Sequence, residues 1–252
     1  MKYKLNNNLI ERYSRQIVLK NIGVIGQKKI INAKVLIVGV GGLGCPVAEC
    51  LARSGVGTIG VVDNDKISLS NIHRQSMYDT KDVGKYKVDV IKNKLKKINH
   101  HSKVEIFKNR LKKNNVEKLI QKFDIIVDGS DNFSTKLLLN KKCKKFKKKL
   151  IVGAISKFDG HIFTFDFINK KTPCLKCFYQ TEPSDEILNC EAEGIIGSVA
   201  GIIGNIQANE VLKKIINIGS DLSGKILIIN LLNLNFRKIS FSKKKNCLCG
   251  IW

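Results

Sequence analysis

The stretch Val35-Leu36-Ile37-Val38-Gly39-Val40-Gly41-Gly42-Leu43-Gly44 decides the fold of this chain. It begins with a four-residue apolar run, which is typical of a strand buried on both faces. It ends in Gly39-x-Gly41-x-x-Gly44, and residues 46–54 predict a helix with a proline near its first turn. This order of strand, glycine turn and helix start is the context that a nucleotide-phosphate loop requires, because backbone N–H groups can approach phosphate there. We therefore expect Gly39, Gly41, Gly42 and Gly44 to bind nucleotide, although a glycine-rich turn without a ligand has the same pattern.

Apolar and helical segments alternate along the rest of the chain. The expected strands are residues 58–62, 104–107, 124–128, 150–154, 161–167, 225–230 and 236–241, and the expected helices are 25–31, 87–99, 115–121 and 195–216. This pattern predicts an α/β fold: a doubly wound, Rossmann-like, mostly parallel sheet with additional antiparallel strands in the C-terminal half. The 252 residues contain no repeat and no Pro- or Ser-rich linker. We expect a single domain over 1–252, with a nucleotide half at about 1–153 and a second half at about 154–252.

The chain is strongly basic, with 45 Lys+Arg against 21 Asp+Glu and a formal net charge of +24. Most of the excess is lysine and is widely spread, and the densest run, residues 141–149, is interpreted as the solvated face of a helix. Because no aromatic-and-basic recognition motif accompanies the charge, we do not expect nucleic acid as a partner. No apolar run has the length of a membrane span, and residues 1–11 have no apolar core of signal-peptide type. The expected location is the cytoplasm, with no membrane partner.

Charged residues follow the expected strands at informative positions. Asp63 ends the second strand, about 20 residues beyond the glycines, where an acceptor for ribose hydroxyls belongs. Asp131 follows the fourth strand, where it could hold Mg²⁺ through oxygen. Either aspartate could instead cap a turn or a helix. Arg74 and Lys87 lie downstream of the glycine loop, and both could reach phosphate oxygens.

Eight cysteines without a secretion signal favour metal or thiol chemistry over a disulfide framework. Cys174 and Cys177 form a CxxC pair, Cys190 stands alone in a polar loop, and Cys247-x-Cys249 lies at the end of the chain. The remaining cysteines are interpreted as packing residues in or beside helices: Cys45, Cys50 and Cys143.

These features occur in a recognisable order. The ordered motifs are RYSRQI (12–17), GVGGLG (39–44), Asp63, SLSNIHRQ (68–75), VGKYK (83–87), DGSDN (128–132), PCLKC (173–177), Cys190 and the terminal cysteine pair. From Arg12 to Gly250 the chain resembles the bacterial ThiF/MoeB/HesA group, the adenylyltransferases ancestral to ubiquitin-activating enzymes. A lone GxGxxG motif is weak evidence, but this ordered series is specific.

The resemblance implies a reaction between ATP and the C-terminal carboxylate of a small ubiquitin-like sulfur carrier protein that ends in Gly-Gly. The products are an acyl adenylate and pyrophosphate, and catalysis consists mainly of alignment and charge neutralisation. The family analogy assigns the ribose to Asp63, the nucleotide site to Asp65, the triphosphate to Asn71, Arg74 and Lys87, and the metal ion to Asp131. It also assigns to Arg15 the role of an arginine finger that enters the neighbouring subunit's site, which implies a homodimer.

The cysteines resemble two further family features. Cys174 and Cys177 match half of a four-thiolate structural zinc site, whose second half is normally CxxC but is here Cys247-x-Cys249. A reduced, metal-free set is the alternative. Cys190 matches a reactive cysteine of ThiF-like enzymes, while MoeB-like enzymes carry a cysteine there that adenylation does not need.

Three classes of function remain open. Carrier adenylation serves either molybdopterin synthesis, which we favour, or thiamine thiazole synthesis. An NAD(P)-dependent oxidoreductase would use the same glycine loop and Asp63. It leaves several charged residues and the cysteine pairs without a role, the charged residues being Arg15, Arg74, Lys87 and Asp131. A non-catalytic nucleic-acid-binding or scaffold protein is supported only by the net charge.

Overall fold

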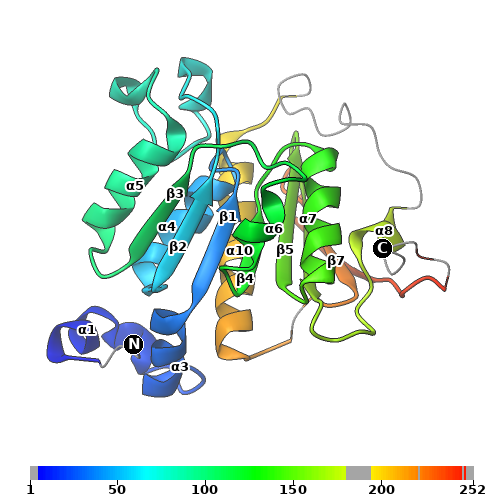
Figure 1. Ribbon diagram of the computed structural model, residues 1–252, viewed down its shortest axis with the longest axis horizontal. Helices are drawn as coiled ribbons and strands as arrows, with labels where there is room; N and C mark the ends of the chain where they lie inside the picture. The colour runs from blue at the N-terminus through cyan, green and yellow to red at the C-terminus, as the bar shows by residue number, and fades with distance from the viewer. Residues whose placement is uncertain (1–4, 180–193, 221, 246, 248–252) are drawn as a thin grey trace.

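Eight strands form one sheet in the order β3-β2-β1-β4-β5-β6-β7-β8 (Figure 1). The computed structural model describes residues 5–179, 194–220, 222–245 and 247. The strands are β1 (Lys34–Val38), β2 (Thr58–Val62), β3 (Lys103–Phe107), β4 (Ile125–Asp128), β5 (Lys149–Ser156), β6 (Asp159–Asp166), β7 (Lys225–Asn230) and β8 (Asn235–Ser240). Strands β1 to β5 pair in parallel, and β6, β7 and β8 pair antiparallel. The predicted fold class is confirmed.

Helices cover both faces of this sheet (Figure 1). The helices of the described chain are α1 (Asn7–Arg12), α2 (Ser14–Ile17), α3 (Gly23–Asn32), α4 (Gly44–Ser54), α5 (Lys87–Ile98), α6 (Val116–Ile120), α7 (Phe133–Lys145), α8 (Leu175–Phe178) and α10 (Gly197–Ile216), with short 3₁₀ helices at Leu69–Asn71 and Thr80–Asp82. One apolar cluster joins the sheet to α4, α5 and α10, and a second joins it to α6, α7 and α8.

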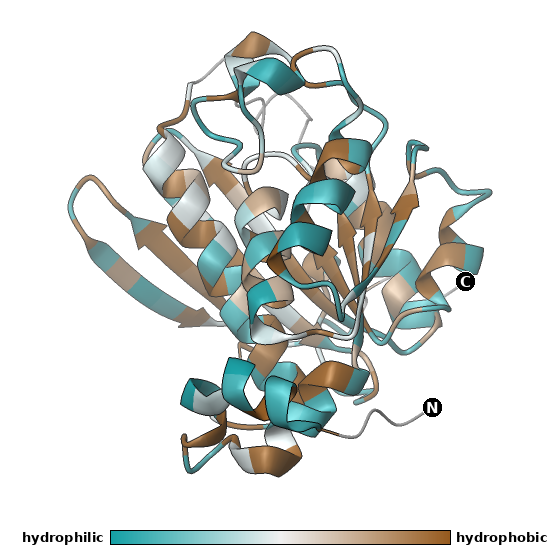
Figure 2. Ribbon diagram, turned by 90° about the vertical axis from the view of Figure 1, so that its left-hand side faces the viewer, coloured by the Kyte–Doolittle hydropathy of each residue, from teal (hydrophilic) through white to brown (hydrophobic). Residues whose placement is uncertain are grey.

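Strand β1 contributes to both clusters, as a centrally placed parallel strand must. Val35 and Ile37 pack toward α4 and α10, while Leu36 and Val38 pack toward α6 and α7. All four are almost completely buried, which explains why the sequence reads as an uninterrupted apolar run. Figure 2 shows that the central strands are predominantly hydrophobic along their length.

The lysine-rich run at 141–149 differs from its prediction as one solvated helical face. Helix α7 ends at Lys145, Lys147 takes a left-handed conformation with φ 51°, and Lys149 already begins β5. The run therefore spans a helix end, a turn and a strand start, because β5 must begin beside Ile125 to continue the parallel sheet.

Helix α10 packs against α4 and across strands β5 and β6. Polar side chains interrupt its apolar surface, and Gln207 and Glu210 are buried among its neighbours. Within the described ranges, the structure has no helix with the length and apolar character needed to cross a membrane.

Candidate nucleotide-binding site

The glycine turn after β1 packs tightly against the loop that follows β4. Gly39 has φ +81°, a left-handed conformation that favours glycine, and a Cβ there would lie 2.9 Å from the Gly129 carbonyl oxygen. A Cβ on Gly44 would lie 2.0 Å from the Gly39 carbonyl oxygen. A Cβ on Gly41 would meet only the Gln75 side chain, at 3.6 Å. The turn itself therefore requires Gly39 and Gly44, whereas Gly41 borders open space.

Helix α4 begins at this turn and presents its N-terminus to the same side. Within the described chain, no side chain caps its first turn, which also has no acidic residue. The backbone N–H groups of a first helical turn have no partner inside the helix, and the helix dipole favours negative charge there. This end of α4 is suited to an anion.

A cavity of about 480 Å³ opens where β1, β2 and β4 end. Its volume lies within the range of about 300–1,000 Å³ that is typical of small-ligand sites, and its position is where open α/β sheets bind their ligands. Most of the predicted nucleotide-binding residues line it: Gly39, Gly41, Gly42, Asp63, Asp65, Arg74, Lys87 and Asp131. Gly44 supports the turn from behind rather than lining the cavity.

Asp63 is fixed by the backbone around it. One carboxylate oxygen accepts a hydrogen bond from the Val40 N–H at 2.9 Å, and the other accepts from the Asp65 N–H at 2.8 Å. Burial raises the pKa of Asp63, and the nearby Lys87 ammonium opposes that shift. The carboxylate is therefore held rigidly at the cavity wall, with both oxygens in defined directions.

Lys87 is a buried cation at the start of α5. Its Nζ donates to Asp65 Oδ2 at 2.9 Å, and its side chain is 8% exposed, against 56% for Asp65. The exposed carboxylate can rotate into solvent, which would leave the ammonium free to face a phosphate in the cavity.

Arg74 and Asn71 lie on the segment between β2 and α5, and only Arg74 reaches the cavity. Arg74 Nη1 donates to the Ser70 carbonyl oxygen at 2.7 Å and lies 2.8 Å from His73 Nε2. Asn71 is buried, and its Oδ1 accepts from the Ser68 N–H at 3.3 Å, as part of a reciprocal cap on the 3₁₀ helix. In the described structure Asn71 is not among the residues that line the cavity, so its direct contact with phosphate stays a prediction.

Asp131 is exposed at the mouth of the cavity, on the loop from β4 to α7. Its Oδ1 accepts a hydrogen bond from Asn132 Nδ2 at 3.2 Å. Asn132 also caps α7, because its Oδ1 accepts from the Thr135 N–H at 2.9 Å. Capping of α7 therefore belongs to Asn132, and Asp131 is part of the cavity lining.

Arg15 lies far from the cavity of its own chain. Arg15 is exposed on α2. The next residue of this helix, Gln16, donates from Nε2 to the Ser54 carbonyl oxygen at the C-terminal end of α4. Helix α4 has 11 residues, which separates its two ends by about 16 Å at the rise of an α-helix. The structure does not bring Arg15 to the other site residues.

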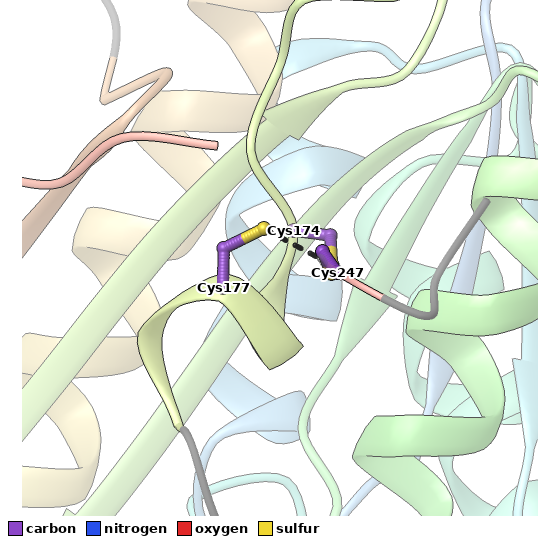
Figure 3. A group of neighbouring side chains, drawn as sticks. All are labelled: Cys174, Cys177 and Cys247. Carbon is purple, nitrogen blue, oxygen red and sulfur yellow. Dashed lines mark hydrogen bonds between the residues drawn. The ribbon is translucent and has the colours of Figure 1, made fainter. Parts of the chain in front are cut away.

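Three of the four predicted metal ligands converge at α8 (Figure 3). Cys174 Sγ lies 3.8 Å from Cys177 Sγ and 3.6 Å from Cys247 Sγ, and all three sulfur atoms lie within 4.8 Å of one another. Tetrahedral Zn²⁺ with Zn–S bonds of about 2.3 Å places its sulfur atoms about 3.8 Å apart. The three thiols therefore fit zinc, while Cys249 lies outside the described residues.

The other cysteines separate into packing residues and one that is not described. Cys45 and Cys143 are completely buried, and Cys50 is half-buried. Burial raises the pKa of Cys45 to about 12, and its Sγ donates to the Val40 carbonyl oxygen at 3.2 Å. These thiols are unreactive packing groups. Cys190 lies outside the described residues.

Sequence reasoning missed two parts of the site. Asn109, Arg110 and Leu111 line the cavity after β3, and a signal was available, since carboxyl ends of neighbouring parallel strands share one edge. Lys136 is 1% exposed and contacts the loop that carries Asp131. Its signal was its spacing with the other buried residues of α7: Phe133, Asn140 and Cys143.

Comparison with known proteins agrees with this geometry. The adenylyltransferase and sulfurtransferase MOCS3 of Drosophila virilis is 39% identical over 245 residues, covering 96% of this chain and 54% of that protein. The protein of the same name from Culex quinquefasciatus is 39% identical over 247 residues, covering 97% of this chain and 56% of that protein. The chain thus spans about half the length of these curated relatives.

Solved structures share the whole architecture. The crystal structure of E. coli MccB with MccA-N7isoASN has a TM-score of 0.84 and 26% identity, covering 99% of this chain and 76% of that one. That of E. coli MccB with ATP has a TM-score of 0.83 and 28% identity, covering 97% and 75%. The profile of the ThiF family matches residues 13–251. This chain therefore belongs to the ThiF family.

Proposed function

We propose that this protein adenylates the C-terminal glycine carboxylate of a small ubiquitin-like sulfur carrier protein that ends in Gly-Gly. The observation that carries the proposal is the gathering of a glycine turn, the cations Arg74 and Lys87, and Asp131 around one open cavity in a ThiF-family chain. The similarity to proteins named adenylyltransferase and sulfurtransferase MOCS3 supports the molybdopterin type over the thiamine thiazole type.

The chemistry needs positioning and positive charge rather than a base. A carboxylate oxygen of the carrier attacks the α-phosphorus of ATP, the bond from that phosphorus to the bridging oxygen breaks, and pyrophosphate leaves. The nucleophile is already ionised at neutral pH, so no residue has to remove a proton from it. Arg74 and Lys87 would neutralise the charge that develops on the triphosphate. Lys87 would exchange its contact with Asp65 for one with phosphate.

The residues present fit ATP. A phosphate can approach the backbone at Gly41, where a side chain would otherwise project, and the uncapped end of α4 favours its charge. Asp63 would accept hydrogen bonds from the ribose hydroxyls, since each of its oxygens keeps a lone pair beyond the one used by a backbone N–H. Asp65 lies beside it at the same wall.

Mg²⁺ would be held by Asp131 together with phosphate oxygens and water. Mg²⁺ in such sites uses one or two carboxylates and substrate phosphates rather than a complete protein cage. The exposed carboxylate of Asp131 in the cavity lining fits this pattern. The ion would supply charge neutralisation to the leaving pyrophosphate.

A structural Zn²⁺ would be held by Cys174, Cys177 and Cys247, with Cys249 as the proposed fourth ligand. It would tie α8 to the C-terminal segment. We assign no chemical step to it. Cys190 remains a candidate for a thiol that bonds covalently with the carrier during sulfur transfer.

We further propose a homodimer in which Arg15 completes the partner's site. Exposed apolar side chains gather on and between α1, α2 and α3 at the end of the molecule that carries Arg15. They are Ile10 (44% exposed), Val18 (73%), Leu19 (54%), Val24 (45%) and Ile25 (74%). Such a patch is typical of a protein interface, and an isologous contact would bring both copies of Arg15 to the neighbouring chains.

The carrier would dock beside the β7–β8 hairpin. Leu232 (64% exposed), Leu234 (74%) and Phe236 (53%) lie at or next to its turn. Asn230 pairs with Asp159, which follows the carboxyl end of β5, so this turn lies at the same end of the sheet as the cavity. The high positive charge of the chain would favour an acidic carrier. We place the reaction in the cytoplasm, with neither nucleic acid nor membrane as partner.

The test is carrier-dependent exchange of labelled pyrophosphate into ATP. We expect exchange with a carrier that ends in Gly-Gly, none with the same carrier lacking its last glycine, and no turnover of NAD(P). Hydride transfer without pyrophosphate exchange would instead establish the oxidoreductase alternative and refute the proposal. A thiazole-pathway carrier that is preferred over the molybdopterin type would correct the pathway alone.

A further inference from the structure

Lys136 is the most deeply buried lysine of the described chain, with 1% of its surface exposed. Its Nζ donates to the Ser130 carbonyl oxygen at 2.7 Å and to the Gly153 carbonyl oxygen at 2.7 Å, and it lies 3.5 Å from Asp128 Oδ2. An ammonium has three N–H donors, and here each one has an acceptor. The side chain therefore holds one position.

The acceptors of Lys136 belong to three chain segments that border the cavity. Asp128 ends β4, Ser130 lies in the loop that carries Asp131, and Gly153 precedes the cavity-lining residues Ala154 and Ile155 of β5. The buried ammonium thus fixes the segments of the cavity wall relative to one another.

The loop is held from its other side by Asp128. Asp128 Oδ1 accepts from the Ser130 N–H at 2.9 Å and from Ser130 Oγ at 2.6 Å. The peptide between Gly129 and Ser130 also lies close to the glycine turn. A Cβ on Gly39 would lie 2.9 Å from the Gly129 carbonyl oxygen and 3.2 Å from the Ser130 nitrogen. A shift of Ser130 would move Asp131, the next residue of the loop, whereas the glycine turn is also held by the Gly39 N–H, which donates to the Val62 carbonyl oxygen at 2.9 Å.

We infer that Lys136 is a positioning residue, which holds the Gly129–Asn132 loop so that Asp131 meets the metal ion of MgATP. The inference rests on the proposed function. A role in stability alone is a weak explanation, because a buried ion pair is often no more stabilising than apolar residues of similar volume. All three Lys136 contacts, moreover, go to chain segments that border the cavity, and Ser130 itself lines it.

The experiment compares ATP binding with and without Mg²⁺ by calorimetry, so no carrier or turnover is needed. Mg²⁺ increases the affinity for ATP by a certain factor, and in Lys136→Met this factor is expected to be about 10- to 100-fold smaller than in the wild type. Losses of this size are usual when a residue that orients a metal ligand is removed. Its affinity for ATP without Mg²⁺ should stay close to that of the wild type, because Asp63 and the glycine turn bind the nucleoside and phosphates.

The matched control is Lys214→Met. Lys214 is also buried and lies 3.4 Å from Asp166, at the opposite end of the sheet, where β6 pairs with the start of β5. This variant should lose stability without any change in the magnesium effect. Lys136→Arg, which keeps the positive charge, should recover part of the effect.

Ser130→Ala supplies a milder test should Lys136→Met fail to fold. It removes the 2.6 Å bond to Asp128 and should raise the Mg²⁺ concentration at half-saturation. The inference is overturned if folded Lys136→Met or Ser130→Ala shows the wild-type magnesium effect, or if Lys214→Met loses that effect equally. A wild-type protein without magnesium-dependent ATP binding would instead refute the proposed function itself.

Discussion

An alanine series through the glycine turn separates what the fold requires from what the nucleotide requires. At Gly44, a Cβ would lie 2.0 Å from the Gly39 carbonyl oxygen, so the turn would have to move by about 1 Å to reach even the 3.0 Å limit of real contacts. Forced overpacking of this kind costs about 1–3 kcal/mol or more. Gly44→Ala should therefore lower the free energy of unfolding by at least that amount.

Gly41→Ala should behave in the opposite way. Its Cβ would meet only Gln75 Nε2, at 3.6 Å, so the substitution should leave stability unchanged or raise it by about 0.4–1 kcal/mol through the unfolded state. The methyl group would nevertheless occupy the space that a phosphate needs beside the backbone. Displacement of one hydrogen bond to a charged group costs about 1.5–3 kcal/mol, which corresponds to roughly 10- to 150-fold weaker ATP binding.

Urea unfolding followed by circular dichroism gives the stabilities, and calorimetry gives the ATP affinities. Gly42→Ala provides an intermediate case, because its Cβ would lie 3.2 Å from Ala200 Cβ, a contact that a small shift of α10 relieves. Wild-type ATP affinity in folded Gly41→Ala would mean that the turn does not hold the phosphates. Equal destabilisation of the Gly41 and Gly44 variants would contradict the described geometry.

Three further predictions concern the parts around the turn. Arg15→Ala and Asp131→Ala should each abolish pyrophosphate exchange without unfolding the chain. A mixture of the two variants should recover about one quarter of the wild-type sites, because half of randomly formed dimers are mixed and each mixed dimer has one intact site. No recovery would argue against an arginine supplied by the partner. Cys174→Ser should abolish the binding of about one zinc per chain, measured by metal analysis, and a wild-type protein without zinc would show that the shortened terminal pair has destroyed the site. Leu234→Asp should raise the KM for the carrier with little change in the affinity for ATP, and an unchanged KM would remove the hairpin from the docking surface.

Local signals were sufficient for the bounds of two strands, β2 and β7. The predicted bounds of β2 and β7 agree with the structure, because each is an apolar run that ends at a polar residue or a turn. Predicted bounds were less accurate for β5 and β6, which extend to eight residues each. Their length is set by antiparallel pairing from Lys149–Asp166 to Ser156–Asp159, and a partner strand is not visible in a local window.

Site residues could be predicted where they belong to a sequence motif. They could not be predicted where only the strand order of the sheet brings them together. The glycine turn and Asp63 have a fixed spacing along the chain, and the structure brings them to one cavity. Lys136 precedes a lysine-rich run, and a lysine in such a sequence is expected to be exposed to solvent. Its burial could therefore not be predicted from its residue type. The residues that contact it, Asp128 and Gly153, are 8 and 17 positions away in sequence, on two strands that only the parallel sheet makes neighbours.

The position of Arg15 gives the proposed dimer a chemical reason. Among the described residues, the cations that line the cavity within one chain are Arg74, Lys87 and Arg110. In the proposed reaction, the transferred α-phosphate is flanked by an incoming carboxylate and by departing pyrophosphate, so negative charge accumulates around it. Arg15 lies at the far end of α4 in its own chain, beside the exposed apolar patch of α1 to α3. In the proposed dimer, burying that patch against a second copy would bring Arg15 of one chain to the cavity of the other. The site would then be complete only in the assembled dimer.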